Sequence, residues 1–126
     1  MSTNLRDYFE NTEGTGVLGT ADAQGNVDLA VYARPHVVDD ETVAFVMSDR
    51  TSHANVTANP HAAYLFVEQG KGYKGKRLHL TKTGEETDPE RVEAFRRESR
   101  KGRDYGDKQA FLVYFKVDKT RPAVGD

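Results

Sequence analysis

Six short segments rich in β-forming residues, most of them joined by tight turns, constrain the fold of this chain most strongly. Turns such as DAQGN at 22–26 favour hairpins, in which neighbouring strands run antiparallel. Pro35 lies inside the second segment and cannot donate a ladder hydrogen bond, which indicates an edge or a bulge there. The sequence therefore predicts a mainly β (α+β) fold of six antiparallel strands, closed or nearly closed into a barrel. The predicted strands are residues 14–21, 27–38, 43–48, 61–68, 76–82 and 109–117.

Two to four short helices are expected between these strands. The stretch 4–11 has apolar residues at helical intervals and Asn4 as its N-cap. A second helix follows residue 50, with Thr51 or Ser52 as the cap and Asn59-Pro60 as the stop. The clearest helical pattern covers 87–102, where Thr87 or Asp88 is the expected cap and a proline follows in the first turn.

Composition limits the class of protein. The 126 residues suit one domain spanning 1–126, and the formal charge of −2 argues against binding to nucleic acid or to an anionic membrane. The polar N-terminus and the lack of a long apolar run predict a cytoplasmic protein. There is no cysteine, which excludes disulfides and thiolate chemistry. No metal site is expected, because the histidines lack ligand spacing; they are His36, His53, His61 and His79.

The stretch EQGKGYKGKR at 68–77 contains a glycine pattern that resembles two nucleotide-binding motifs. Gly70, Gly72 and Gly75 match G-x-G-x-x-G, and residues 70–76 match most of a P-loop. Both motifs need a helix after the glycines to hold the phosphates. Here Leu78 and Leu80 alternate with polar residues, which is typical of a strand. The sequence therefore predicts a hairpin loop with glycines at positive φ.

The stretch SDRTSHAN at 48–55 has the groups that bind a phosphate monoester. It joins a strand to a helix, and it supplies hydroxyls, the Arg50 guanidinium and helix N-terminal amides. The alternative is a capped helix whose polar residues are solvated. In the stretch VYARPH, Tyr32, Arg34 and His36 alternate and are expected on one strand face, either around a ligand or simply exposed.

The order of these features resembles the small FMN-binding split-barrel proteins of the pyridoxamine 5′-phosphate oxidase-like group. The resemblance covers roughly residues 4–125. It depends on the hairpin, the DRTSHAN loop, the NP helix stop and the RLHLT strand. It implies a six-stranded antiparallel split β-barrel that forms a homodimer, with FMN at the interface between the chains.

The same resemblance implies which residues bind FMN. The second strand would run beside the flavin, and the end of the third would face the isoalloxazine. Arg50, Thr51 and Ser52 would hold the phosphate, with Asn55 near it. Arg77 would approach the ring, and the glycine loop would cover it. The remaining implied residues are Val31, Tyr32, Ala33, Arg34, Pro35, Val46, Met47 and Ser48.

The expected function is that of an FMN-dependent oxidoreductase acting on a small-molecule substrate or electron donor, because in this group the cofactor supplies the redox chemistry. No residue stands out as a general acid or base. Two alternatives stay open. One is a flavin-binding or electron-transfer protein that is not an enzyme, and the other is a split barrel that binds deazaflavin F420 or haem.

Overall fold

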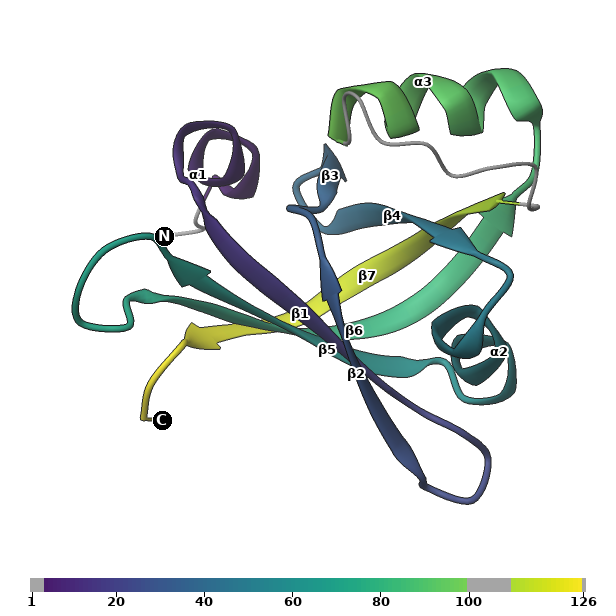
Figure 1. Cartoon of the computed structure of the whole chain (residues 1–126), viewed down its shortest axis with the longest axis horizontal. Coiled ribbons are helices and arrows are strands. Elements are labelled where there is room, and N and C mark those ends of the chain that lie inside the picture. Colours follow the sequence, from purple (N-terminus) through teal and green to yellow (C-terminus); the bar gives the residue numbers. More distant parts are fainter. Residues whose placement is uncertain (1–3, 100–109, 126) are drawn as a thin grey trace.

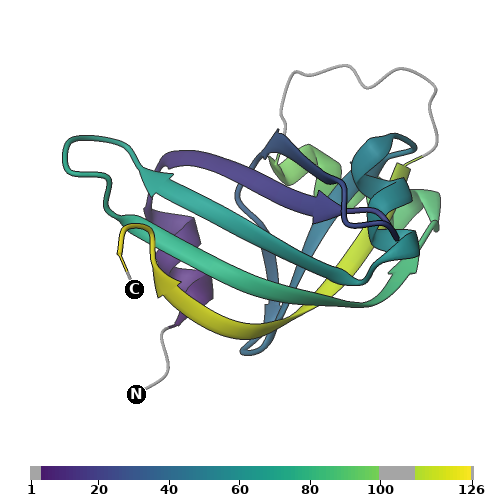
Figure 2. The same cartoon turned by 90° about the horizontal axis from the view of Figure 1, so that it is seen from below.

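The computed structural model describes residues 4–99 and 110–125, which form one strongly curved antiparallel sheet with three helices around it (Figures 1 and 2). The strand order is β2-β1-β5-β6-β7-β4-β3. The helices are α1 (Leu5–Asn11), α2 (Thr51–Ala58) and α3 (Pro89–Ser99). The strands are β1 (Gly14–Ala21), β2 (Val27–Tyr32), β3 (His36–Asp39), β4 (Thr42–Ser48), β5 (His61–Glu68), β6 (Gly75–Glu86) and β7 (Ala110–Pro122).

The mainly β split-barrel prediction is confirmed, with seven strands in place of six. The second predicted strand is two strands, because the chain leaves β2 after Tyr32 and begins β3 at His36. These two strands are the opposite edges of the sheet, so residues 33–35 connect one edge to the other. Pro35 lies in this link, where its missing N–H leaves no ladder position unpaired.

Alternating side chains fill the interior of the barrel. Leu18 of β1, Tyr64 and Phe66 of β5, and Phe115 of β7 are fully buried. The ring of Phe66 meets that of Phe9 edge to face, and the ring of Phe115 meets that of Phe45 in the same way, an arrangement that suits aromatic quadrupoles. A second, smaller cluster lies between α3 and the sheet; its buried members are Ala44, Val92, Ala110 and Leu112.

The helix starts were predicted with mixed success. Asn4 caps α1, and its side chain accepts a hydrogen bond from the Asp7 amide, as expected. Asp88 accepts one from the Glu90 amide at the start of α3. For α2 the prediction was wrong, because Arg50 occupies the cap position and makes no side-chain capping bond. Asn59 follows the last residue of α2, in agreement with the predicted stop.

The glycine stretch is a hairpin loop, as predicted. Gly70 and Gly72 have φ values of 118° and 94°, and the Glu68 amide bonds to the Lys74 carbonyl across the loop. Tyr73 also has a positive φ, 54°, and its side chain is exposed. The β5–β6 hairpin projects beyond the end of the barrel (Figure 2).

Candidate functional site

The loop before α2 is the best-formed candidate for binding an anion. Arg50 and Thr51 are exposed, and α2 begins directly after Arg50. The first turn of a helix has amides that the helix cannot pair, and its dipole favours negative charge there. Within the described residues, the Arg50 guanidinium makes no hydrogen bond or ion pair. The charge, the hydroxyl and the amides therefore lie together at an accessible surface.

Two of the residues predicted for this loop point inward. Ser52 and Asn55 are only 7% and 8% exposed. Asn55 donates a hydrogen bond from Nδ2 to Thr20 Oγ1 of β1, at 3.0 Å. Asn55 therefore fixes α2 against the barrel, and its amide group is already paired.

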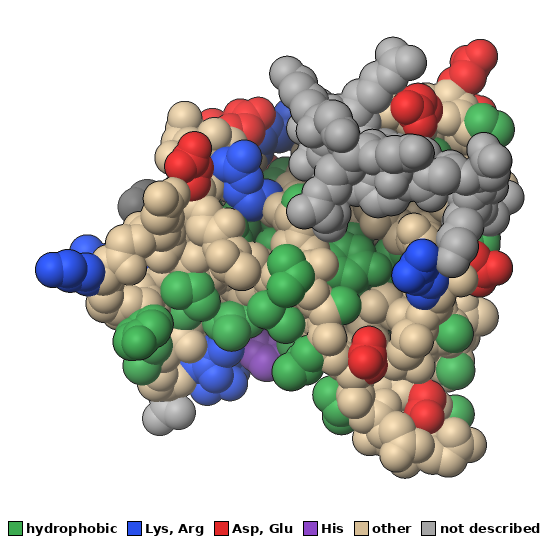
Figure 3. Space-filling view, viewed as in Figure 1, with side chains coloured by type: hydrophobic (Ala, Val, Ile, Leu, Met, Phe, Trp, Pro, Cys, Tyr) green, Lys and Arg blue, Asp and Glu red, His purple; other side chains and the backbone are tan. Residues whose placement is uncertain are grey.

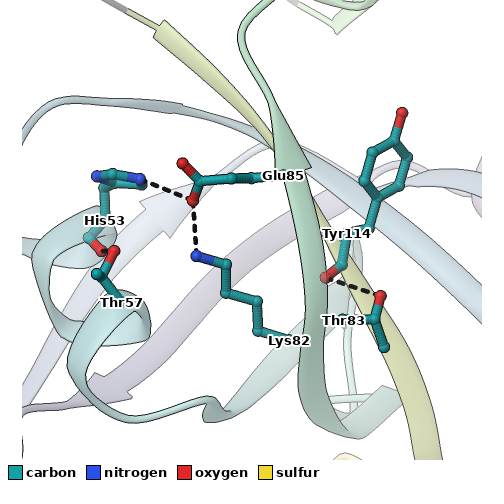
Figure 4. Close-up of polar contacts among 6 residues, drawn as sticks. All are labelled: His53, Thr57, Lys82, Thr83, Glu85 and Tyr114. Carbon is teal, nitrogen blue, oxygen red and sulfur yellow. Dashed lines mark hydrogen bonds and ion pairs between the residues drawn. The ribbon is translucent and has the colours of Figure 1, made fainter.

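A polar cluster holds the other side of α2 (Figure 4). The His53 ring stacks on Phe111 of β7, with centroids 3.7 Å apart and planes 7° from parallel. His53 Nε2 lies 3.0 Å from Glu85 Oε1, and Lys82 Nζ lies 2.6 Å from the same oxygen. Burial raises the pKa of Glu85, but the hydrogen bonds from Lys82 and His53 outweigh this effect and hold that pKa below its usual value. The cluster ties the first turn of α2 to β6 and β7.

The link between β2 and β3 borders a cleft of about 460 Å³. Arg34 lies in this link and donates from Nη1 to the carbonyls of Phe9 and Thr12, at 2.8 and 2.9 Å. These carbonyls belong to the C-terminal end of α1, where a cation also complements the helix dipole. Arg6 of α1 lines the same cleft and donates to the carbonyls of Val37 and Val38.

The prediction that Tyr32, Arg34 and His36 share one strand face was wrong. Tyr32 ends β2, and its ring packs edge to face on Phe45 in the core. Arg34 turns to α1, and His36 begins β3, where its ring contacts Phe95 of α3. The residues between β2 and β3 break the alternation that the sequence suggested.

The side chains at the end of β4 point in alternate directions. Met47 is fully buried in the main core. Val46 packs against the cluster under α3. The resemblance implied that the end of this strand faces the isoalloxazine, and the opposite directions of Val46 and Met47 do not allow both side chains to face it. Ser48 ends the strand and is half-buried.

Val31 and Arg77 lie in one row across the outer face of the sheet. Val31 pairs with Val17, Val17 with Leu65, and Leu65 with Arg77. Directly opposite residues point to the same face of a sheet. Three strand spacings separate the ends of this row by about 14 Å. The Arg77 guanidinium also turns away from β2, because it donates to the carbonyls of Pro122 and Gly125.

The outer face near β2 is apolar and exposed. Val27, Leu29 and Val31 are 71%, 69% and 69% exposed. Figure 3 shows hydrophobic side chains gathered over β1, β2 and β5 on this face. A contiguous apolar surface of this kind marks an interaction site in many proteins.

Sequence reasoning missed two residues beside the predicted site. Arg6 lines the cleft, but its spacing within 4–11 gave no sign of this. Tyr64 is fully buried and donates from its hydroxyl to the link after β2. In the sequence, Tyr64 is one of several apolar residues of the predicted strand 61–68. Its phenol hydroxyl, which needs a hydrogen-bond partner when buried, was the available signal.

Neither a metal centre nor a membrane helix is found in the described part of the chain. Among residues 4–99 and 110–125, no group of three or more His, Asp or Glu residues is placed to hold a metal ion. None of the helices in these two ranges is long and apolar enough to cross a membrane.

The curved antiparallel sheet, with the short helix α2 after β4, is the fold of split β-barrel proteins. The family model described as pyridoxamine 5′-phosphate oxidase matches residues 2–122. The chain therefore belongs to the pyridoxamine 5′-phosphate oxidase family. No curated protein sequence matches the chain closely enough to count as a relative.

Solved structures share the fold at low sequence identity. An FMN-binding protein from Syntrophomonas wolfei subsp. wolfei is 18% identical, with a TM-score of 0.75; the match covers 97% of this chain and 85% of that one. An F420 reductase is 15% identical, with a TM-score of 0.69 and coverage of 91% and 94%. HutZ, the haem storage protein from Vibrio cholerae, is 19% identical, with a TM-score of 0.66 and coverage of 91% and 89%. One architecture thus occurs in proteins whose names refer to FMN, F420 and haem.

Proposed function

We propose that this protein binds FMN, with the phosphate held at the N-terminus of α2. The observation that carries this proposal is the exposed Arg50 guanidinium, which has no partner among the described residues. It lies beside the Thr51 hydroxyl and the free amides of the first helical turn. A phosphate monoester needs a cation and several hydrogen-bond donors. The residues present fit that group.

We also propose that FMN is shared between two copies of the chain. Val31 and Arg77 of one chain lie about 14 Å apart, at opposite ends of a row, and Arg77 points away from Val31. Both can approach one flavin if each comes from a different chain. The apolar outer face of β2 supplies a surface for this homodimer.

The proposed activity is that of an oxidoreductase acting on a small molecule. Bound FMN supplies hydride or electron transfer. The protein's part is to fix the phosphate through Arg50 and Thr51 and to place a positive charge, Arg77, near the ring. Such a charge favours a reduced, anionic flavin.

F420 or haem binding is the second candidate, and it is favoured by one observation. An F420 reductase and a haem storage protein share this fold at TM-scores of 0.69 and 0.66. At 15% and 19% identity, these likenesses show a shared fold. The exposed anion site at α2 fits the phosphate-bearing flavins better than it fits haem.

The decisive experiment is the visible spectrum of the purified protein, followed by heat release and identification of any chromophore. The cofactor-free protein is then titrated with FMN, F420 and haem. We expect FMN to bind most tightly. Tighter binding of F420 or haem would replace FMN in the proposal, and failure to bind all three would contradict it. Reduction of bound FMN by NADH or NADPH, with turnover, separates an enzyme from a flavin carrier.

A further inference from the structure

We propose that Tyr64 is a positioning residue for the FMN site, acting from inside the barrel through the link between β2 and β3. This inference rests on the proposed function, because it concerns how the residues next to the flavin are held. Tyr64 belongs to β5 and is fully buried, so it makes no contact with a ligand itself.

The Tyr64 hydroxyl bonds to the backbone where β2 ends. Its distances to the carbonyl oxygens of Tyr32 and Ala33 are 3.3 and 3.1 Å. Successive carbonyls of a regular strand point in opposite directions, so two consecutive carbonyls around one hydroxyl mark a bend. The phenol therefore stabilises the bend that takes the chain out of β2.

A glycine makes room for this hydroxyl. Gly16 of β1 pairs with Tyr32. A Cβ at Gly16 would come within 1.8 Å of the Tyr64 hydroxyl oxygen and 2.7 Å of the Tyr32 carbonyl oxygen. Only a residue without a side chain allows the phenol to reach the neighbouring strand at this point.

The hydroxyl remains a donor at ordinary pH. Burial raises the pKa of Tyr64, which keeps the phenol protonated. Tyr64 also brings a hydroxyl into a main core cluster that is otherwise made of apolar side chains. A buried hydroxyl is costly unless it is paired, so its pairing with this bend specifies one backbone geometry.

The bend determines the positions of predicted FMN contacts both before it and after it in the chain. On one side of it, Val31 is exposed on the outer face of β2. On the other side, Arg34 is directed to the C-terminal carbonyls of α1. If the bend relaxes, the exposed end of β2 and the link after it shift relative to Arg50, which α2 holds separately.

The test is Tyr64→Phe, which keeps the ring and removes the hydroxyl. Tyr8→Phe is the matched control, because Tyr8 also donates one hydroxyl hydrogen bond, to Glu68 at 2.6 Å. We expect the FMN dissociation constant to rise about tenfold in Tyr64→Phe and to stay within about twofold in Tyr8→Phe. In the flavin-free proteins, we expect faster amide hydrogen exchange at Ala33 and Arg34 in Tyr64→Phe only. Equal FMN affinity in the two variants, with unchanged exchange at these amides, would overturn the inference.

A measurement on the wild-type protein covers the case in which Tyr64→Phe does not fold. The ring-carbon chemical shift of Tyr64, next to the hydroxyl, should move when FMN is added, whereas that of Tyr8 should not. An unmoved Tyr64 signal in a protein that binds FMN contradicts the positioning role and leaves the proposed function intact. A wild-type protein that binds no FMN contradicts the proposed function itself; the exchange at Ala33 and Arg34 in a folded Tyr64→Phe protein then decides whether Tyr64 orders the bend.

Discussion

Arg50 and Arg34 both follow the end of a strand, yet their guanidinium groups have different surroundings. Arg34 is paired with two backbone carbonyls of α1. Arg50 is exposed at the start of α2 and makes no capping bond. A guanidinium already paired with carbonyls has fewer donors left for a ligand. Of Arg34 and Arg50, Arg50 is therefore the better phosphate ligand.

We expect Arg50→Ala to weaken FMN binding by about 1–3 kcal/mol, because a charged hydrogen bond to the phosphate is lost. Fluorescence titration of the flavin-free protein measures this change. Arg91→Ala is the control, since Arg91 is also exposed but lies in α3, where it pairs with Glu86 at the end of β6. Unchanged affinity in Arg50→Ala would remove the phosphate from the N-terminus of α2.

Glu85 gives the stability of the fold a pH dependence of known sign. Its folded-state pKa is lowered from 4.5, so its charged form stabilises the protein above that pH. This contribution is lost as the pH falls through the lowered folded-state pKa. Glu85→Gln should reduce the free energy of unfolding by about 0.2–1 kcal/mol near neutral pH, the range for an ion pair at the protein surface.

Urea unfolding of wild type and Glu85→Gln at about pH 7 and about pH 3 tests this prediction. The difference between the two proteins should shrink at the lower pH, where a larger fraction of the wild-type carboxyl is protonated. A difference that persists at low pH would show that the charge of Glu85 is not what stabilises the cluster with His53 and Lys82.

At the scale of elements, α2 is held from two sides. Asn55 bonds to Thr20 of β1, and His53 meets Glu85 of β6 and Phe111 of β7. A short helix with so few buried apolar residues depends on such contacts for its position. The position of α2 in turn decides where Arg50 and the free amides lie.

Asn55→Ala should destabilise the protein by about 1–3 kcal/mol, because the buried Thr20 hydroxyl loses its partner. It should also weaken FMN binding, since α2 is no longer fixed to β1. Thr57→Ala is the control within the same helix; its hydroxyl bonds to the His53 carbonyl of that helix, at 2.8 Å. Thermal unfolding and FMN titration of both variants measure the two effects. A stable Asn55→Ala protein with unchanged FMN affinity would contradict this anchoring role.

Local signals predicted the elements well and their tertiary contacts poorly. The strand at 61–68, the cap at Asn4 and the stop at Asn59-Pro60 all depend on neighbours in sequence, and the structure has them. The break at residues 33–35 depends on Tyr64, about thirty residues away, and on α1. The sequence of this stretch alone contains no sign of those partners.

The candidate site shows the same division. The DRTSHAN loop could be recognised because its polar residues are consecutive, and the structure does place Arg50 and Thr51 together at a helix start. Which of its side chains point inward could not be predicted. Ser52 and Asn55 are buried because α2 packs on β1, a contact between distant parts of the chain.

At the scale of the whole molecule, the outer face of the sheet is what a single chain leaves uncovered. The edge strand β2 presents Val27, Leu29 and Val31 to solvent. Exposed apolar edge strands are aggregation-prone unless something covers them. A second copy of the chain would cover this face through a two-fold axis, so that the same residues would be buried in both chains.

Leu29→Lys should therefore convert the proposed dimer into a monomer. Leu29 is 69% exposed in one chain, so the substitution leaves the core intact and the monomer folded. In the dimer, burying leucine stabilises by roughly 1.5–3 kcal/mol per side chain, and two buried lysine charges would oppose association. Gln24→Lys is the matched control, because it adds the same charge to the exposed turn that ends the same hairpin. Light scattering after gel filtration gives the oligomeric state, and FMN titration gives the affinity.

Because the proposed site takes Val31 and Arg77 from different chains, the Leu29→Lys monomer should lose tight FMN binding. A monomer that binds FMN as tightly as the wild type would show that one chain is sufficient to form the site.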